Sequence, residues 1–448
     1  MTKLIKTILK GLYIDQRFYY MGGAIVVLFV LSFFLPFLLI ISKILLYALL
    51  GLILLDILLL FRTEPGIHIT RIMPEKLSNG DKNLVTIQIK NQYNFTIKAS
   101  VIDEIPEEFQ IRDFNIITHL NKGKMTELPY QIRPTFRGLV DFGNTHVYVS
   151  SPLKLAQRKY TFDTKKGIPV YPSFLQLKKY EFLAFSNRIL QHGLKKVRRL
   201  GHTMEFEKIK EYVPGDDIRT VNWKSTAKSN KLMVNLYQDE RSQSIYCILD
   251  AGRVMKMPFE GLSLLDYAIN AILVLSSIAL RKQDYAGFFS FSKRIENRVA
   301  SDRRTYQMKR IMEALYNVKT DYYESDYSRL FRDVKKNIPQ RSLLLLFTNF
   351  ETIDGLQRQL PYLKAIARSH LLIIIFFHNT EMDTILHTRS EDTAEIFDKI
   401  IAEKLHFEKK LIVQELQKFG IHTILTKPEH LTIDTINMYL EIKAKGMI

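Results

Sequence analysis

A pair of adjacent carboxylates, Asp216 and Asp217, is the clearest place in the chain where residue type and spacing could support chemistry. Two neighbouring carboxylates can act as a general acid and a general base, so a hydrolase is one hypothesis. The pair follows a Pro-Gly turn signal, and adjacent residues in a turn usually point in different directions. Arg219 and Lys224 are close enough in the sequence to neutralise the pair. We therefore expect the two aspartates to cap the helical turn that follows, in a structural or docking role.

A third carboxylate, Asp250, follows the apolar run from Ile245 to Leu249, which predicts a buried strand. A hydrolase that uses Asp216, Asp217 or Asp250 is the alternative to a protein without enzymatic activity. The motifs that would complete an active site are missing. The sequence has no Gly-x-Gly-x-x-Gly or Gly-Lys-Ser/Thr phosphate loop, no Gly-x-Ser-x-Gly elbow and no His-Glu-x-x-His pattern. We therefore expect that the protein is not an enzyme.

Residues 243–448 must position Asp250, and they alternate between apolar strands and amphipathic helices. Strands are expected at 245–250, 285–291, 342–348, 370–377 and 422–425. Helices are expected at 261–279, 305–316, 327–336, 394–419 and 433–443. Continuous apolar strands that alternate with helices predict a doubly wound α/β domain with a parallel sheet covered on both faces. Ligands of such sheets bind at the carboxyl ends of the strands.

Residues 62–175 show a different pattern, in which apolar and polar residues alternate with a period of two. Val85–Asn91 and Gly143–Ser150 are examples, and turn signals separate such runs. Several short strands at this spacing predict an all-β, immunoglobulin-like sandwich. No catalytic cluster is found here, so we interpret the domain as an interaction or spacer module. Residues 176–242 are expected to form a linker segment to the α/β domain.

Two apolar runs, Phe18–Ile41 and Ile44–Phe61, precede these domains, and each is near the ~20 residues that a helix needs to cross a bilayer. The polar break Ser42-Lys43 predicts a tight turn, so that residues 18–61 form a two-helix transmembrane hairpin. A cleaved signal peptide is the main alternative, but the stretch is too long for one and lacks a small-residue cleavage site. Asp56 lies in the second run, where a carboxylate is costly, so we expect it to face the partner helix or an interface.

Charge predicts the orientation of the hairpin and the kind of partner. The tail at residues 1–17 carries four basic side chains, whereas the break offers only Lys43, so both ends are expected on the cytoplasmic side. The net charge of +18 suits an anionic partner. We interpret it as a basic surface that lies beside an anionic bilayer. A basic nucleic-acid-binding protein is a further alternative, but aromatic residues do not interleave the basic ones. The single cysteine, Cys247, excludes an intrachain disulfide and is expected in the core.

Residues 201–228 form a dense polar segment with a recognisable pattern. Its marked positions are Gly201, Glu205, Phe206, Glu211, Tyr212, Pro214, Gly215, Asp216, Asp217, Arg219, Trp223, Lys224 and Ala227. This pattern closely resembles the signature of the bacterial "domain of unknown function 58" family, with Asn222 in place of a more common Asp. The runs Arg71-Ile-Met-Pro, Arg137-Gly and Val170-Tyr-Pro extend the resemblance toward the N-terminus, as does the twin-helix anchor. Trp223, the only tryptophan, is expected to pack under the segment.

The resemblance implies that the α/β domain is of the von Willebrand factor type A class. In that class an Asp-x-Ser-x-Ser loop, a Thr and a later Asp hold a divalent cation at the strand ends, and such hard oxygen ligands suit Mg²⁺. The sequence departs from the pattern. Its first loop is Asp250-Ala-Gly-Arg253-Val, Ser325 is a stand-in for the Thr, and Asn349 replaces the Asp. We expect a degenerate site at Asp250, Ser325 and Asn349 that binds no metal and no cofactor, with Arg253 in the electrostatic role of the cation.

The resemblance also implies a role. Membrane-anchored members of the family resemble partners of MoxR-type AAA+ ATPases, so we expect a non-enzymatic adaptor in protein-complex assembly or cell-envelope maintenance. The face near Asp250, Ser325 and Asn349 is the expected docking surface, and the signature segment is expected to brace it or to join the contact. The expected location is a bacterial inner membrane, crossed twice, with the soluble domains in the cytoplasm. The expected partners are the lipid bilayer, the ATPase and other membrane proteins, but no nucleic acid.

Overall fold

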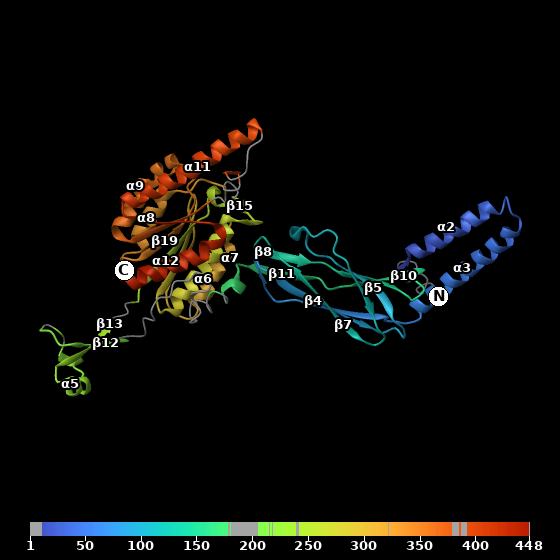
Figure 1. The fold of residues 1–448 in the computed structure, drawn as a ribbon, viewed down its shortest axis with the longest axis horizontal. Coiled ribbons are helices and arrows are strands. Elements are labelled where there is room, and N and C mark those ends of the chain that lie inside the picture. Colours follow the sequence, from blue (N-terminus) through green and yellow to red (C-terminus); the bar gives the residue numbers. More distant parts are fainter. Residues whose placement is uncertain are drawn as a thin grey trace. The chain divides into compact units, whose positions relative to one another are not determined.

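The computed structural model describes residues 11–177, 180, 205–214, 216, 218–238, 242–320, 322–378, 385–386 and 392–447. The chain divides into two compact units, Met1–Tyr171 and Pro172–Ile448 (Figure 1). The first unit carries two apolar helices and sheets built almost wholly from antiparallel strands, and the second carries a mixed α/β sheet. The multidomain architecture expected from the sequence is confirmed at this level.

Two apolar helices, α2 (Gln16–Leu31) and α3 (Phe37–Phe61), pack side by side at one end of the first unit (Figure 1). The turn between them spans residues 32–36, so the expected break at Ser42-Lys43 is wrong. Ser42 continues the helix because its Oγ donates a hydrogen bond to the carbonyl oxygen of Leu38, four residues earlier, at 2.8 Å. By length and composition α3 can cross a membrane, whereas the 16 residues of α2 extend only about 24 Å along its axis.

The rest of the first unit is β-structure in three sheets with the strand orders β1-β10-β9-β5-β6, β2-β4-β7 and β3-β11-β8. The strands are β1 (Leu12–Ile14), β2 (Ile67–Ile72), β3 (Leu77–Ser78), β4 (Asn83–Asn91), β5 (Ile97–Asp103), β6 (Ile116–Leu120), β7 (Met125–Ile132), β8 (Gly138–Phe142), β9 (Thr145–Ser150), β10 (Ala156–Phe162) and β11 (Lys166–Tyr171). Every second residue of β5 is buried, so one face of the strand lines the core and the other faces outward. This is the physical origin of the period-two pattern in the sequence.

Buried polar contacts join the helices to this β-structure. Asp56 is buried, and its Oδ2 accepts hydrogen bonds from the backbone N–H groups of Leu155 (2.9 Å) and Ala156 (2.8 Å), at the start of β10. Arg158 of β10 donates from Nη1 to the carbonyl oxygen of Leu60, near the end of α3, at 2.9 Å. The strand β1 also pairs with β10, although it lies in the stretch that the sequence suggests to be only a tail. Asp56 therefore fastens the hairpin to the sheet through these two hydrogen bonds.

The second unit contains a six-stranded sheet with the order β18-β17-β14-β19-β20-β21. Its strands are β14 (Ser244–Asp250), β17 (Tyr285–Phe291), β18 (Ile295–Asp302), β19 (Leu343–Phe347), β20 (Leu371–Phe377) and β21 (His422–Thr426). The edge strand β18 runs antiparallel to β17, so the expected parallel sheet is in fact mixed. The sequence conceals β18 because an edge strand alternates exposed and half-buried residues, whereas the inner strands are continuous apolar runs.

Helices cover both faces of this sheet (Figure 1). They are α6 (Leu264–Arg281), α7 (Gln307–Asn317), α8 (Tyr327–Asn337), α9 (Ile353–Ser369), α11 (Thr393–Lys418) and α12 (Leu431–Lys445). One core forms between the sheet and α6, α7 and α12, and a second forms between the sheet and α8, α9 and α11. α6 is apolar enough to resemble a membrane span, but it is mostly buried in this domain. α9 is not among the helices expected from the sequence, because Gly355 and Pro361 interrupt its pattern.

Candidate functional site

The carboxyl ends of two central parallel strands, β14 and β19, lie next to each other. The chain leaves β14 toward one face of the sheet and β19 toward the other, an arrangement that opens a crevice at the strand ends. Asp250 ends β14, Asn349 follows β19, and Ser325 precedes α8. These three residues line one cavity of about 130 Å³. The three residues that the sequence predicted to form one site therefore lie together in the structure.

Asp250 is only 1% exposed, and both of its carboxylate oxygens accept hydrogen bonds from the protein. Oδ1 accepts from Ser325 Oγ and from the backbone N–H of Gly252 at 2.9 Å. Oδ2 accepts from Thr348 Oγ1 at 2.7 Å and from the Tyr327 hydroxyl at 3.2 Å. Glycine is required at position 252, because a Cβ there would overlap Ser325 Oγ. Asp250 thus ties together its own loop, the start of α8 and the end of β19.

Burial governs the protonation of this cluster. Burial raises the pKa of Asp250 above its ordinary value, although the hydrogen bonds from Ser325, Thr348, Gly252 and Tyr327 oppose the rise. Burial also raises the pKa of Tyr327, and the negative charge of Asp250 raises it further. The tyrosine hydroxyl therefore keeps its proton at neutral pH and acts as a donor to the carboxylate.

These residues do not fit a bound Mg²⁺, which needs an octahedron of oxygen ligands and is usually held through one or two free carboxylates. The oxygens of Asp250 already accept four hydrogen bonds, and Oδ1 of Asn349 accepts one from the ammonium of Lys409 at 2.6 Å. Within the part of the chain that the structure describes, no cluster of three or more His, Cys, Asp or Glu side chains is arranged for a metal. The cation at this loop was expected to be Arg253, but Arg253 is exposed and Lys409 of α11 binds Asn349 instead.

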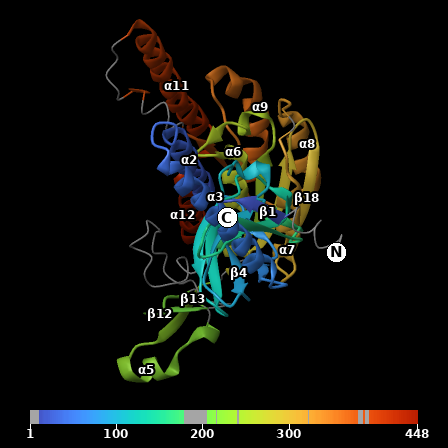
Figure 2. The ribbon, with the colours of Figure 1, turned by 90° about the vertical axis from the view of Figure 1, so that its right-hand side faces the viewer.

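Much of the signature segment folds as a small hairpin, where the sequence suggested a linker. β12 (Glu205–Glu211) pairs antiparallel with β13 (Met233–Gln238). The connection contains the 3-10 helix η3 (Ile218–Thr220) and the short helix α5 (Trp223–Ser229). Figure 2 shows α5 at the tip of the hairpin. The signature is thus a structural element of its own.

Asn222 holds the tip of the hairpin together. Its side-chain oxygen accepts a hydrogen bond from the backbone N–H of Ser225 at 3.0 Å and so caps α5. Its Nδ2 donates to Oδ1 of Asn235 on β13 at 2.8 Å. Its backbone N–H donates to the carbonyl oxygen of Met233 at 2.8 Å. Asn222 therefore caps α5, whereas Asp217, which precedes η3 and was expected to cap the turn there, lies outside the described residues.

Asp216 has a different task. It pairs with the ammonium of Lys210 at 2.8 Å and accepts a hydrogen bond from the backbone N–H of Val213 at 3.0 Å. The hydrogen bond from Lys210, followed by that from Val213, lowers the pKa of Asp216. Lys210 is thus a partner of this carboxylate that the sequence did not suggest, whereas the side chain of Arg219 lies outside the described residues. A carboxylate held ionised in this way is a poor proton donor at neutral pH.

The tip of the hairpin exposes large apolar side chains. Trp223 is 71% exposed, Ile218 is 70% exposed and Val213 is 56% exposed. We call Val213, Ile218 and Trp223 the tip residues. The expectation that Trp223 packs under the segment is therefore wrong, because α5 has only two turns and buries none of its residues.

Several signature positions lie outside the described residues, namely Gly201, Gly215 and Asp217. The same holds for the side chains of Glu205, Phe206 and Arg219. Of the other signature positions, Glu211 forms an exposed ion pair with Lys231 at 3.0 Å, Tyr212 and Pro214 lie in the connection, and Lys224 is exposed.

Three residues of the Asp250 cluster were not expected from the sequence. Thr348 and Tyr327 stand next to expected positions, and a polar residue at a strand end or at a helix start is a signal that could have identified them. Lys409 lies 60 residues after Asn349, on a different element, and the sequence carries no signal for their contact.

Comparisons with known proteins agree with the resemblance in this region. Residues 208–384 match the family described as "Protein of unknown function DUF58". The "Uncharacterized protein YeaD" of Bacillus subtilis (strain 168) is 25% identical over 190 residues, covering 39% of this chain and 45% of that protein. The chain thus spans less than half the length of this curated relative. Among solved structures, BatB from Bacteroides thetaiotaomicron is 12% identical with a TM-score of 0.30 and covers 46% of this chain and 100% of its own. The CARDB domain of a Pyrococcus furiosus protein is 13% identical with a TM-score of 0.17, over 23% of this chain and 86% of its own.

Proposed function

We propose that the chain is a membrane-anchored, non-enzymatic interaction protein. Its hairpin tip and C-terminal domain dock to a MoxR-type AAA+ ATPase, which works in protein-complex assembly or cell-envelope maintenance. The observation that carries this proposal is the exposure of the three tip residues. Leaving a large apolar side chain in water forgoes roughly 1.5–3 kcal/mol of burial, so such residues suit a surface that a partner covers.

The chemistry of the tip favours a protein partner with an apolar pocket and an acidic rim. Tryptophan is enriched among the residues that dominate binding energy at protein interfaces. Lys224 and Lys228, both exposed, flank Trp223 on α5 and suit a negatively charged rim. The strand-end cavity at Asp250 is bordered by Arg253, Glu324, Glu351 and Arg358, and it forms the second, polar part of the proposed contact.

The proposed fold classes rest on topology. When the six strands of the β14 sheet are numbered in chain order, their order across the sheet is 3-2-1-4-5-6, with the third strand antiparallel. We assign this domain to the von Willebrand factor type A class with a degenerate cation loop. We assign the β-structure of the first unit to the immunoglobulin-like class, on the basis of its antiparallel sheets and its alternating burial.

A non-enzymatic role is supported by the state of the candidate carboxylates. Asp250 is enclosed, and four protein donors occupy its oxygens. Asp216 is ion-paired with Lys210. Neither carboxylate is placed to exchange a proton with a substrate, so the hydrolase alternative has no described residue to act as its base.

The anchor supports a cytoplasmic placement of both units. Arg17 and Arg62 lie at the open ends of α2 and α3, whereas the turn at residues 32–36 has no Lys or Arg, and Lys43 alone lies toward that end. By the positive-inside rule the open ends face the cytoplasm, where AAA+ ATPases are found. In this proposal the two helices cross the bacterial inner membrane together, as one hairpin that is fastened to the β-structure.

Co-purification tests the proposal. The full-length protein, extracted in detergent from its own host, should retain a MoxR-type ATPase in near-stoichiometric amount. The double variant Trp223→Ala/Ile218→Ala should lose it. A matched control is Leu139→Ala/Leu84→Ala, which removes two apolar side chains of similar exposure, 65% and 57%, from the first unit. Equal recovery with both double variants would overturn the proposal.

A further inference from the structure

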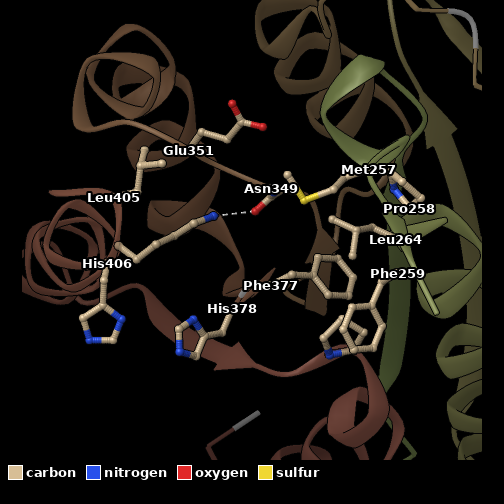
Figure 3. A pocket seen from close by; sticks show the side chains of 12 residues that line it. Met257, Pro258, Phe259, Leu264, Asn349, Glu351, Phe377, His378, Leu405 and His406 are labelled. Carbon is tan, nitrogen blue, oxygen red and sulfur yellow. Dashed lines mark hydrogen bonds between the residues drawn. The ribbon is translucent and has the colours of Figure 1, made fainter. Parts of the chain in front are cut away.

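A second cavity, of about 140 Å³, lies at the strand ends (Figure 3) and shares Asn349 and Glu351 in its lining with the cavity at Asp250. Its wall is mainly apolar and is built from four elements that follow β14, β19, β20 and β21, together with α11. The apolar side chains that line it include Met257, Phe259, Leu264, Phe377 and Leu405. A dry cavity of about this size accommodates a six-membered ring. The space therefore suits a small compact apolar group.

The cavity also contains polar groups that the protein leaves incompletely bonded. The ammonium of Lys409 donates to Asn349 Oδ1 at 2.6 Å and lies 5.7 Å from the ring centre of Phe376. An ammonium carries three N–H donors, and among the described residues Asn349 is its one hydrogen-bond acceptor. Nδ1 of His406, which also lines the cavity, is buried and has no hydrogen-bond partner within the described part of the chain. A polar ligand atom could accept a hydrogen bond from the ammonium, and another could bond to Nδ1 of the imidazole.

The charge of this site is poorly compensated. Burial lowers the pKa of Lys409 to about 8, and the negative charge of Glu351 only partly opposes that shift. Glu351 is exposed, so solvent screens its charge. A desolvated cation without a buried counter-ion is costly, and an anion brought into the cavity would remove that cost.

We propose that this cavity binds a small monocarboxylic acid with a compact apolar body, whose carboxylate pairs with the Lys409 ammonium and whose body fills the space between Phe259, Leu264 and Phe377. One ammonium matches one monovalent carboxylate. A phosphate ester carries more charge than a single lysine can balance, and it would meet apolar walls. This cavity is distinct from the cavity at Asp250, although Asn349 and Glu351 line both and Lys409 bonds to Asn349.

The proposal predicts a pH dependence with a definite sign. The ligand binds the protonated form of Lys409, so its affinity should fall as the pH rises through about 8, and binding should raise the pKa of Lys409. Glu351, His378 and His406 also face the cavity. The pH dependence of the affinity is assigned to the Lys409 ammonium only if the variant Lys409→Met abolishes that dependence.

Benzoate is the probe, and its neutral counterpart benzamide is the control ligand. Binding of both to the full-length protein in detergent is followed by saturation-transfer NMR, and the pKa of Lys409 is followed by NMR of labelled lysine. Benzoate should bind at one saturable site about tenfold or more tightly than benzamide, as expected for a charge-assisted contact. Lys409→Met should reduce benzoate to the level of benzamide. Lys410→Met, which changes the neighbouring exposed lysine of α11, is the matched control and should leave both affinities unchanged.

Leu405→Trp fills the cavity without touching the charge, and it should abolish binding of both ligands. Unchanged melting temperatures of these variants show that they fold. Equal affinities for benzoate and benzamide, or a Lys409→Met variant that binds benzoate as the wild type does, would overturn the proposal. The absence of saturable benzoate binding would overturn it as well.

Discussion

The end of β14 and the tip of the signature hairpin differ in whether their most notable side chain is buried or exposed. At the strand end a charged residue, Asp250, is buried, and every oxygen of its carboxylate has protein donors. At the tip an apolar residue, Trp223, is in water. Each is the reverse of what its residue type favours. The first arrangement completes its hydrogen bonds within the chain, whereas the second leaves a large apolar side chain exposed.

This comparison teaches that residue type alone does not identify the functional position. Asp250 was expected to belong to a degenerate cation site, but its hydrogen bonds make it a brace for three segments. Trp223 was expected to pack under its segment, yet it is exposed. In these two regions, a group whose hydrogen bonds are completed within the chain has a structural role, whereas a group that is left exposed is a candidate for binding.

The largest expected effect is the loss of the brace in Asp250→Ala. The variant removes the acceptor of the buried Ser325 hydroxyl and leaves Thr348 and Tyr327 only the hydrogen bond between their own hydroxyls, so the free energy of unfolding should fall by roughly 3 kcal/mol. Asp250→Asn keeps the shape and one acceptor, and it should cost only about 1 kcal/mol. The buried thiol of Cys247, the only cysteine, reports unfolding of this domain through its labelling in urea. Equal costs for both variants would show that the hydrogen bonds are not what Asp250 contributes.

The next effect tests the other side of the comparison. Under the proposed function, Trp223→Ala should weaken binding of the proposed ATPase partner by about 2 kcal/mol, roughly thirtyfold, because a large anchor is removed from the proposed interface. Trp223→Phe should lose less than half of that. Neither change should alter Cys247 labelling, since the side chain is 71% exposed. A fall in domain stability with unchanged binding would contradict the assignment of Trp223 to docking.

A smaller effect follows from the raised pKa of Asp250. The folded state holds its proton to a higher pH than the unfolded state, in which an aspartate has a pKa of about 3.9. Between these two pKa values the unfolded state binds fewer protons, so the free energy of unfolding falls as the pH rises and is constant above that window. Thiol labelling of Cys247 across this range should show the slope in the wild type. Asp250→Asn should remove it, and a slope that persists in the variant belongs to another group.

No effect is expected from magnesium. The melting temperature of the full-length protein should be the same in excess Mg²⁺ and in a chelator, because the oxygens of Asp250 and Asn349 are bonded to protein donors. Thermal scans of the wild type and of Asn349→Asp make the comparison sharper, because the variant introduces the carboxylate that the proposed von Willebrand factor type A class has at this position. A magnesium-dependent rise in the wild type would mean that the loop opens to take a cation.

Much of the α/β domain could be predicted from the sequence. The expected strand at 285–291 has the bounds of β17, and the expected helix at 327–336 ends within one residue of α8. Gly420 follows α11 with a positive φ of 72°, as a residue just after a helix end often does. Burial determines the spacing of apolar residues in strands and amphipathic helices, and these elements could therefore be predicted from the hydrophobic pattern.

The failures have local causes. Ser42 seemed a turn residue, but a serine that bonds to the carbonyl four residues back continues a helix. The sequence does not show that α5 is too short to bury Trp223. The contact between Lys409 and Asn349 joins two distant segments, and only the packing of α11 on the sheet creates it. The candidate site was therefore predictable in its position at the strand ends, but not in its bonding.

Site-specific photo-crosslinking in the native membrane tests the central claim most directly. A benzoyl-phenylalanine at position 223 of the full-length chain reports what covers the tip, and the same residue at position 139 is the control. The proposal predicts one protein adduct at position 223, containing the MoxR-type ATPase, that is absent at position 139. Adducts to lipid alone at position 223, or the same adducts at both positions, would contradict the claim that the hairpin tip is a docking surface for a protein partner.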